Sequence, residues 1–155
     1  GYVGLTLLDS LNNSICNCSF IRNGITVWGY DFSSIFYIHL CNNTVNGKPL
    51  LYYKNEQNVT LDAVDAGQIF IVNCSNFKVN DINISDVNIG VGIYSSSDIN
   101  LSQISITRSR GGIFIQNSTN CNISNSTIVG CGLDYQNSSL GIFQKLIRSK
   151  LKKEK

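Results

Sequence analysis

Residues 68–89 read QIFIVNCSNFKVNDINISDVNI, and this pattern returns in residues 90–111, GVGIYSSSDINLSQISITRSRG, and residues 112–133, GIFIQNSTNCNISNSTIVGCGL. Four columns stay in phase across the three segments, and all but Ser126 are apolar: Phe77, Ile99 and Cys121; Val79, Leu101 and Ile123; Ile82, Ile104 and Ser126; Ile84, Ile106 and Ile128. A polar column of Asn76, Asp98 and Asn120 runs beside them. A fixed period in the range of 20 to 50 residues indicates a stacked repeat architecture.

Within each segment the apolar residues alternate with period two, as in Ile82-x-Ile84, which is the spacing of a strand. They are mostly Ile, Val and Phe, and the Asn, Ser, Asp and Gly between them tolerate turns. Short strands joined by tight bends and stacked about 4.8 Å apart predict a right-handed parallel β-helix of about 22 residues per coil. A leucine-rich repeat is excluded because Leu101 is the only leucine between Gln68 and Gly132.

The ends of the chain follow the repeat less closely. Residues 15–20 resemble residues 40–45, which predicts coils with looser spacing near the N-terminus. We therefore assign residues 1–140 to coils, with an insertion at about 46–66, and residues 141–155 to a basic cap or tail. Leu140, Phe143, Ile147 and Leu151 would share one face of a short C-terminal helix, which could cap the last coil or lie on a membrane surface.

Composition favours one domain of 155 residues with ample apolar content, 43%, and sparse charge, 14%. Six of the twelve Lys and Arg residues lie within the last eleven positions, so the coils themselves are mildly acidic. This excludes the basic stripe of a nucleic-acid surface. No transmembrane span or signal peptide is found, and the start in mid-repeat leads us to expect a longer parent chain.

Six cysteines occur, in a chain too large to need a disulfide scaffold. Cys16 and Cys41 hold matched positions in neighbouring coils, so a disulfide between them is geometrically feasible, and the sequence leaves the pairing open. His39, the single histidine, precedes Cys41 by two positions, and Cys18 lies on the other coil. Because the coil alignment does not make these four groups converge, we expect no metal site and no cofactor.

Asn-x-Ser/Thr sequons recur along the chain, and the turn composition alone would generate many of them. In an exported protein some would carry glycans. We expect occupied sites among four of them: Asn58, Asn100, Asn117 and Asn137.

The most specific strings are NTVNGKPLLYYKN at residues 43–55 and DAGQIFIVNCSN at residues 65–76. They resemble archaeal β-helix proteins, especially those of methanogens, in the NosD-like branch of the pectate-lyase-like superfamily. The resemblance implies an exported or cell-surface protein. It also implies two alternative functions. The superfamily includes polysaccharide lyases and hydrolases, and NosD proteins are linked to copper-site maturation.

Catalysis on polysaccharides requires clustered carboxylates, either to hold calcium or to act as acid and base. In the repeat, Asp81 aligns with Gln103 and Asn125, and Asp86 aligns with Arg108, which favours a surface ion pair. Asp62 and Asp65 fall in the insertion and suit turns. We therefore lean against an enzyme, although a carbohydrate-active lyase or hydrolase remains the alternative.

The insertion supplies the candidate contact residues Tyr52, Tyr53, Lys48 and Lys54, since loops on rigid scaffolds tend to carry binding residues. Tyrosine rings could stack on sugars or pack over a coil. We predict a non-catalytic structural or adhesive module of an exported or surface protein that binds polysaccharide or surface proteins. A NosD-like copper-associated factor is the third hypothesis.

Overall fold

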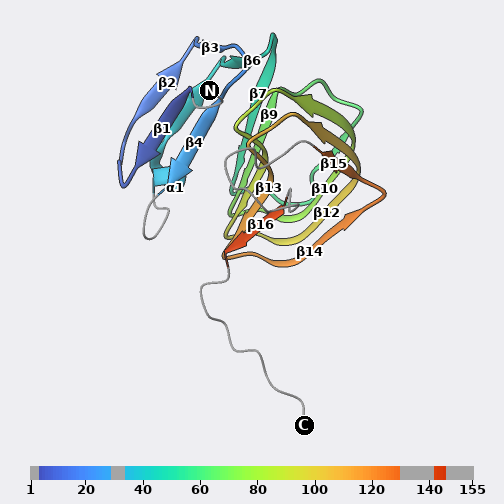
Figure 1. Ribbon diagram of the computed structural model, residues 1–155. Helices are drawn as coiled ribbons and strands as arrows, with labels where there is room; N and C mark the ends of the chain where they lie inside the picture. The colour runs from blue at the N-terminus through green and yellow to red at the C-terminus, as the bar shows by residue number, and fades with distance from the viewer. Residues whose placement is uncertain (1–3, 29–33, 130–141, 146–155) are drawn as a thin grey trace.

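The computed structural model describes residues 4–28, 34–129 and 142–145, which form a nearly all-β solenoid (Figure 1). Parallel coils of about 22 residues make about 5 turns, which confirms the predicted stack of parallel coils. The elements are, in chain order, β1 (Leu5–Leu8), β2 (Ser14–Cys16), β3 (Ser19–Phe20), β4 (Ile25–Trp28), α1 (Ser34–Tyr37), β5 (His39–Cys41), β6 (Thr44–Val45), β7 (Lys48–Lys54), β8 (Thr60–Asp62), β9 (Gln68–Val72), β10 (Ser75–Ser85), β11 (Ile89–Tyr94), β12 (Ser97–Thr107), β13 (Gly111–Gln116), β14 (Thr119–Ser124), β15 (Thr127–Val129) and β16 (Ile142–Lys145).

The register of the stacked strands follows the sequence columns. Strand β12 pairs in parallel with β10 on one side and with β14 and β15 on the other, so that equivalent residues of neighbouring coils lie opposite each other. The matched residues include Phe77, Ile99 and Cys121; Val79, Leu101 and Ile123; Ile84, Ile106 and Ile128. In the remaining column Ile82 lies opposite Ile104, and the Ile104 N–H donates to Ser126 Oγ at 3.0 Å.

Strands β10 and β12 each bend at a residue in the left-handed conformation, and the same bend separates β14 from β15. Asp81, Gln103 and Asn125 occupy one column with φ angles of 53°, 53° and 48°. The bend places one extra residue between Val79 and Ile82, so that both of these side chains are buried in the interior. Asn and Asp adopt this conformation more readily than other side chains, which explains why the corners carry polar columns.

A seven-stranded sheet, in the order β16-β13-β11-β9-β7-β6-β3, is covered on both faces where β9, β11 and β13 lie. On β9, Ile69 and Ile71 belong to the core inside the coils, hereafter the lumen core. Phe70 and Val72 belong to a second cluster on the other face, hereafter the outer core. Strands covered on both faces read as continuous apolar runs, and IFIV at residues 69–72 of β9 is such a run.

The outer core is covered by an N-terminal unit, residues 4–45 without the undescribed 29–33 (Figure 1). Its strands make two coils of their own. Strand β1 pairs in parallel with β4, β2 with β5, and β3 with β6. Ile25, Val27 and Ile35 from this unit pack with Phe70 and with Tyr94. The predicted N-terminal coils are therefore present. They also pack against the outer face of the later coils, where they cover the outer core.

The segment treated above as an insertion is a shorter coil. Strand β7 pairs in parallel with β9, and β8 pairs in parallel with β10, both with an offset of 18 residues (Leu50↔Gln68 and Thr60↔Lys78). The chain enters this coil through an antiparallel hairpin between β6 and β7. Asn46 and Gly47 at its tip have φ angles of 54° and 78°, which suits the Asn-Gly turn of a two-residue hairpin.

The predicted C-terminal helix is wrong for residues 142–145, because β16 is a strand that pairs in parallel with β13. Pairing with an open strand edge satisfies the backbone groups of both strands, and this outweighs the helical spacing of the apolar residues. The other residues of that prediction and the tail at 146–155 lie outside the described residues. Within the described chain, no helix has the length and apolar character needed to cross a membrane.

Candidate functional site

The two tyrosines predicted to contact a ligand lie on opposite faces of β7. Tyr53 packs against the lumen core, where its ring meets that of Phe77 edge-on with centroids 5.1 Å apart. Tyr52 packs against the outer core, and its hydroxyl donates to the Ile35 carbonyl oxygen at 2.7 Å. Burial raises the pKa of both phenols, that of Tyr52 to about 12, with the nearby Cys74 adding to the effect at Tyr52.

The two lysines of the same prediction also make contacts within the protein. Lys54 Nζ donates to the Phe36 carbonyl oxygen at 2.6 Å. Lys48 Nζ lies 3.2 Å from an Asp65 carboxylate oxygen and 3.5 Å from the Asn83 carbonyl oxygen. The four predicted contact residues are therefore not gathered on one surface, although their part in binding stays a prediction.

We expect Tyr52→Phe to destabilise the protein by about 1 kcal/mol at neutral pH, because it removes one hydrogen bond between β7 and α1. The folded-state pKa of Tyr52 lies above its ordinary value of 10, so its neutral form stabilises the fold fully below pH 10 and this stabilisation is lost as pH rises toward 12. Between pH 10 and 12, the free energy of unfolding should therefore fall less for Tyr52→Phe than for the parent protein. Urea unfolding at pH 7, 10 and 12 measures both effects, with exposed Tyr37→Phe as the control.

A groove of about 400 Å³ runs across one corner of four successive coils. It lies where the chain passes from β7, β9, β11 and β13 toward the next strand. None of the side chains that line it is charged: Asn55, Gln57, Asn73, Cys74, Ser75, Ser95, Ser96, Ser97, Asn117 and Thr119. The chemistry of the groove is therefore that of neutral amides and hydroxyls.

At the same corner a column of small polar side chains ties the coils together. Ser96 Oγ donates to the Tyr94 carbonyl oxygen at 2.9 Å and accepts from the Cys74 N–H at 3.1 Å. Ser118 repeats the pattern one coil further, since its Oγ donates to Gln116 and accepts from the Ser96 N–H. These hydroxyls hold the corner of the solenoid in place.

The wall of the groove carries asparagine side chains that can interact further. Asn73 Nδ2 donates to Asn55 Oδ1 at 2.8 Å, and both side chains are exposed. An amide has two donor hydrogens and an acceptor oxygen, so Asn73 retains capacity after this bond. Asn117, also exposed, lines the groove one coil beyond Ser95. The groove thus presents donors and acceptors at the spacing of the coils.

Of the four predicted glycosylation sites, Asn58, Asn100 and Asn117 are exposed, and Asn137 lies outside the described residues. Asn117 lies both in a sequon and in the wall of the groove. A glycan at this position would occupy the groove, so its occupancy and ligand binding there would exclude each other.

Within the described residues, no three or more acidic side chains gather into a cluster. Asp62 Oδ1 accepts from Asn80 Nδ2 at 2.5 Å, and Asp65 pairs with Lys48 as described. Asp98 accepts from the side chain of Asn120 at 3.0 Å. Asp81 is exposed at its bend.

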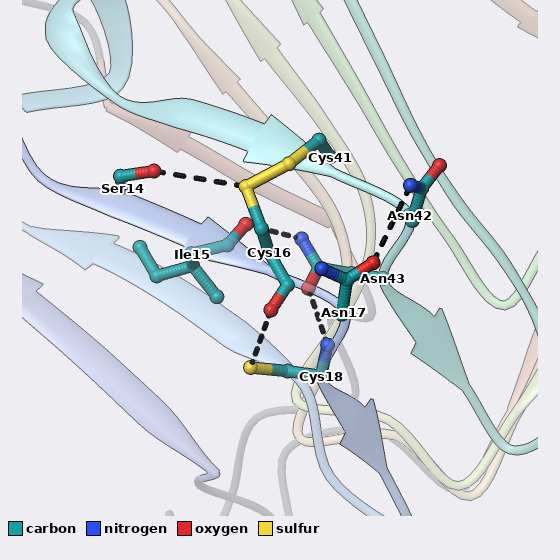
Figure 2. Close-up of a disulfide and its surroundings, with 8 residues drawn as sticks. All are labelled: Ser14, Ile15, Cys16, Asn17, Cys18, Cys41, Asn42 and Asn43. Carbon is teal, nitrogen blue, oxygen red and sulfur yellow. Dashed lines mark hydrogen bonds between the residues drawn. A yellow bond between two sulfur atoms is a disulfide. The ribbon is translucent and has the colours of Figure 1, made fainter.

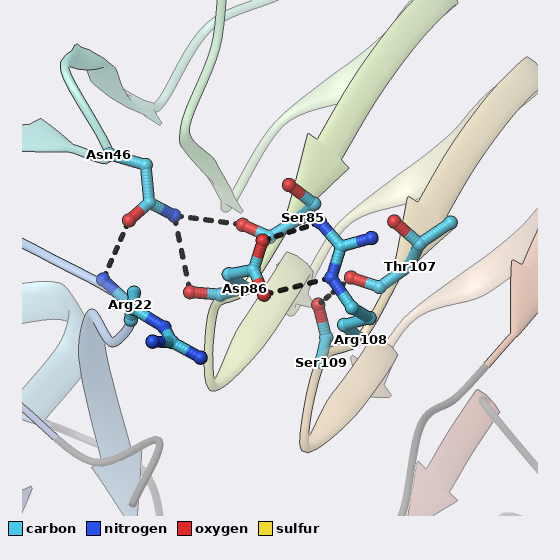
Figure 3. A network of polar contacts seen from close by, with 7 residues as sticks. All are labelled: Arg22, Asn46, Ser85, Asp86, Thr107, Arg108 and Ser109. Atoms are coloured by element: carbon cyan, nitrogen blue, oxygen red, sulfur yellow. Dashed lines mark hydrogen bonds and ion pairs between the residues drawn. The ribbon is translucent and has the colours of Figure 1, made fainter.

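Asp86 and Arg108 form the ion pair that the column alignment favours (Figure 3). Arg108 donates from Nε and a terminal nitrogen to the two carboxylate oxygens, at 3.0 and 2.7 Å. This hydrogen bonding, chiefly with Arg108, lowers the pKa of Asp86. Asn46 joins the N-terminal unit to the same corner, since its side chain accepts from the Arg22 N–H and donates to the Asp86 carbonyl oxygen (Figure 3). The cluster is a structural junction.

Cys16 and Cys41 form a disulfide with a Cα–Cα distance of 4.6 Å, in agreement with their matched coil positions (Figure 2). Among the described cysteines, Cys18 is a free exposed thiol, while Cys74 and Cys121 are free and more buried. Burial raises the pKa of the thiols of Cys74 and Cys121, which keeps them protonated at neutral pH. Cys131 lies outside the described residues.

His39 lies beside the disulfide, so three of the four groups considered above come together, while Cys18 is not among them. One ligand atom each from Cys16, His39 and Cys41 lie within 4.8 Å of one another. The reason is that His39 and Cys41 are two positions apart on one strand, so they point to the same face. Among the described residues this is the only such group of three or more Cys, His, Asp or Glu side chains.

The fold places the chain among parallel β-solenoid proteins. Comparisons with models of protein families, with curated proteins and with solved structures each found no match to this chain. Its function must therefore be argued from its own residues.

Proposed function

We propose that this chain is a non-catalytic module of an exported or cell-surface protein, and that it binds neutral polysaccharide in the corner groove. The observation that carries the proposal is the groove itself, about 400 Å³ in volume and lined without a single charged side chain. Amides and hydroxyls are the partners that sugar hydroxyls require, because they both donate and accept hydrogen bonds. A linear chain of sugars could follow the corner from coil to coil.

Three further features support an extracellular setting. The disulfide between Cys16 and Cys41 suits an oxidising compartment. Exposed sequons, such as those at Asn58 and Asn100, could carry glycans there. The likeness of residues 43–55 and 65–76 to surface β-helix proteins of archaea agrees with this setting, and it is part of the proposal.

Binding is tested with a panel of neutral and acidic polysaccharides, with and without calcium, on protein that carries no glycans. We expect a neutral polysaccharide to bind and Asn73→Gly/Asn117→Gly to weaken binding by about thirtyfold, since two lost hydrogen bonds at about 1 kcal/mol each amount to about 2 kcal/mol. Glycine is chosen because Asn73 and Asn117 have φ angles of 50° and 48°, which glycine adopts without strain.

The matched control is Asn76→Gly/Asn120→Gly, which alters two exposed asparagines that also have positive φ but do not line the groove. It should bind like the parent. Equal loss in both double variants would assign the effect to the fold, and the absence of any ligand would leave a structural role only. New reducing ends or unsaturated products would contradict the non-catalytic proposal and favour a lyase or hydrolase.

A further inference from the structure

The Cys16, His39 and Cys41 side chains occupy the solvent side of a small parallel ladder. Strands β2 and β5 pair with Ile15 opposite Leu40 and Cys16 opposite Cys41. Ile15 and Leu40 pack against the outer core. Because side chains alternate along a strand, the flanking positions face the other way. His39 is exposed and the two cysteines are partly exposed, so the cluster is accessible from solvent.

The spacing of the three groups suits a tetrahedral cation once the disulfide is open. With bonds of about 2.3 Å to sulfur and 2.0 Å to nitrogen, zinc ligands lie about 3.5 to 3.8 Å apart. The three ligand atoms already lie within 4.8 Å of one another. Small side-chain rotations therefore suffice, and the backbone ladder that positions both cysteines stays as it is.

We propose that the Cys16–Cys41 disulfide is a reversible closure over a metal site, and that the reduced cysteines together with His39 bind a thiophilic divalent cation of the zinc type. Two thiolates and one imidazole are a known zinc ligand set with a fourth position for water. The Ser14 hydroxyl, 3.6 Å from Cys16 Sγ, lies at the same face and could hold that water.

The redox step balances with a dithiol reductant. The reductant gives two electrons and two protons to the disulfide and is itself oxidised to a disulfide, so Cys16 and Cys41 become thiols. Binding of the cation then releases the two thiol protons to solvent, while His39 binds through a neutral ring nitrogen. In the reverse direction a disulfide oxidant takes two electrons from the two thiolates and two protons from solvent, becomes a dithiol, and leaves the Cys16–Cys41 disulfide closed and the cation released.

Cys18, which follows β2, is the natural comparison for the cysteines of the cluster. It is a free exposed thiol two residues from Cys16, yet its sulfur lies away from the disulfide and donates to the Cys16 carbonyl oxygen at 3.4 Å (Figure 2). It is not part of the cluster of three. If the cation binds to Cys16, His39 and Cys41 specifically, its affinity should not change when Cys18 is replaced.

The test titrates Co²⁺, a coloured stand-in for Zn²⁺, into the full chain before and after reduction with a phosphine that is then removed. We expect one equivalent to bind the reduced protein, with a thiolate charge-transfer absorption and the colour of tetrahedral cobalt, and Zn²⁺ to displace it. The oxidised protein should not bind. His39→Ala should weaken binding by about tenfold or more, since even the groups around ligands contribute that much.

Cys18→Ser is the control and should bind like the parent, while Cys16→Ser and Cys41→Ser should lose the charge-transfer absorption. Circular dichroism establishes that each variant keeps its strands. The proposal is overturned if the reduced protein binds no cation, if His39→Ala binds as tightly as the parent, or if binding persists without Cys16 or Cys41. It is equally overturned if the disulfide resists reduction in the folded protein.

Discussion

Gln68→Leu is expected to lower the free energy of unfolding by about 3 to 5 kcal/mol, one of the largest effects of any single substitution in this chain. The Gln68 side chain is fully buried at the start of β9. Its amide nitrogen donates to the carbonyl oxygens of Ile25 and Ile89, at 2.8 and 2.9 Å, and its oxygen accepts from the Ile25 N–H at 3.1 Å. Leucine would fill the space but leave these buried backbone groups without partners.

The consequence should be concentrated in the N-terminal unit. Ile25 begins β4, so both of its backbone groups are held by one side chain from the solenoid. Hydrogen exchange should therefore accelerate most in β1 and β4, with a smaller change in β10 and β12. Urea unfolding gives the total loss, and the exchange pattern shows where it occurs.

Gln116→Leu is the matched control, because it removes another buried glutamine from the same sheet. Among the described residues, neither polar atom of the Gln116 side chain has a hydrogen-bond partner. Exchanging that amide for an apolar group of similar size should be neutral or stabilising. A loss at Gln116 as large as that at Gln68 would show that shape, and not hydrogen bonding, decides the stability of this face.

The sequence predicted the central coils because their signal is local and repeated. The columns headed by Phe77 and Val79 recur every 22 residues, and each copy supports the same register. The same reasoning missed the 18-residue coil, because a shorter period breaks the column alignment although β7 and β8 still pair with their neighbours. Asn46-Gly47 was the available signal for the hairpin that begins this coil.

The repeat pattern could not predict that the N-terminal unit packs against the outer face of the later coils. Residues 69–72 of β9 are apolar on both strand faces, which indicates that both faces are covered but does not tell which part of the chain covers them. Tyr52 and Tyr53 were read as one contact surface, but adjacent strand residues point in opposite directions. The C-terminal apolar spacing fitted a helix in isolation, and tertiary pairing with β13 decided otherwise at β16.

The candidate sites were only partly accessible to sequence reasoning. Matched coil positions showed that a disulfide between Cys16 and Cys41 was feasible but left the pairing open, and the structure contains it because the ladder places these equivalent residues side by side. The position of His39 followed from the same register, but it was discounted as two positions away. The corner groove has no motif at all, since it arises from Asn and Ser turn residues that any such solenoid would contain.

Phe77→Ala is the second substitution with a large expected effect, about 3 to 5 kcal/mol of lost stability. Phe77 is fully buried in the lumen core, opposite Ile99 in the next coil and edge-on to the ring of Tyr53 in the preceding one. Truncation would leave a cavity that spans the contact between coils. Rigid stacked strands can collapse only partly around such a cavity, so most of the lost packing energy is not recovered.

Lys78→Ala is the control for this strand, because Lys78 is the exposed neighbour of Phe77 and should change stability by no more than about 0.5 kcal/mol. Hydrogen exchange should distinguish Phe77→Ala from Gln68→Leu, since the cavity loosens β10 and β12 directly. A solenoid is stabilised by each coil and by its contacts with neighbouring coils, so a defect in the middle weakens both sides. A loss below about 1 kcal/mol at Phe77 would contradict a close-packed lumen.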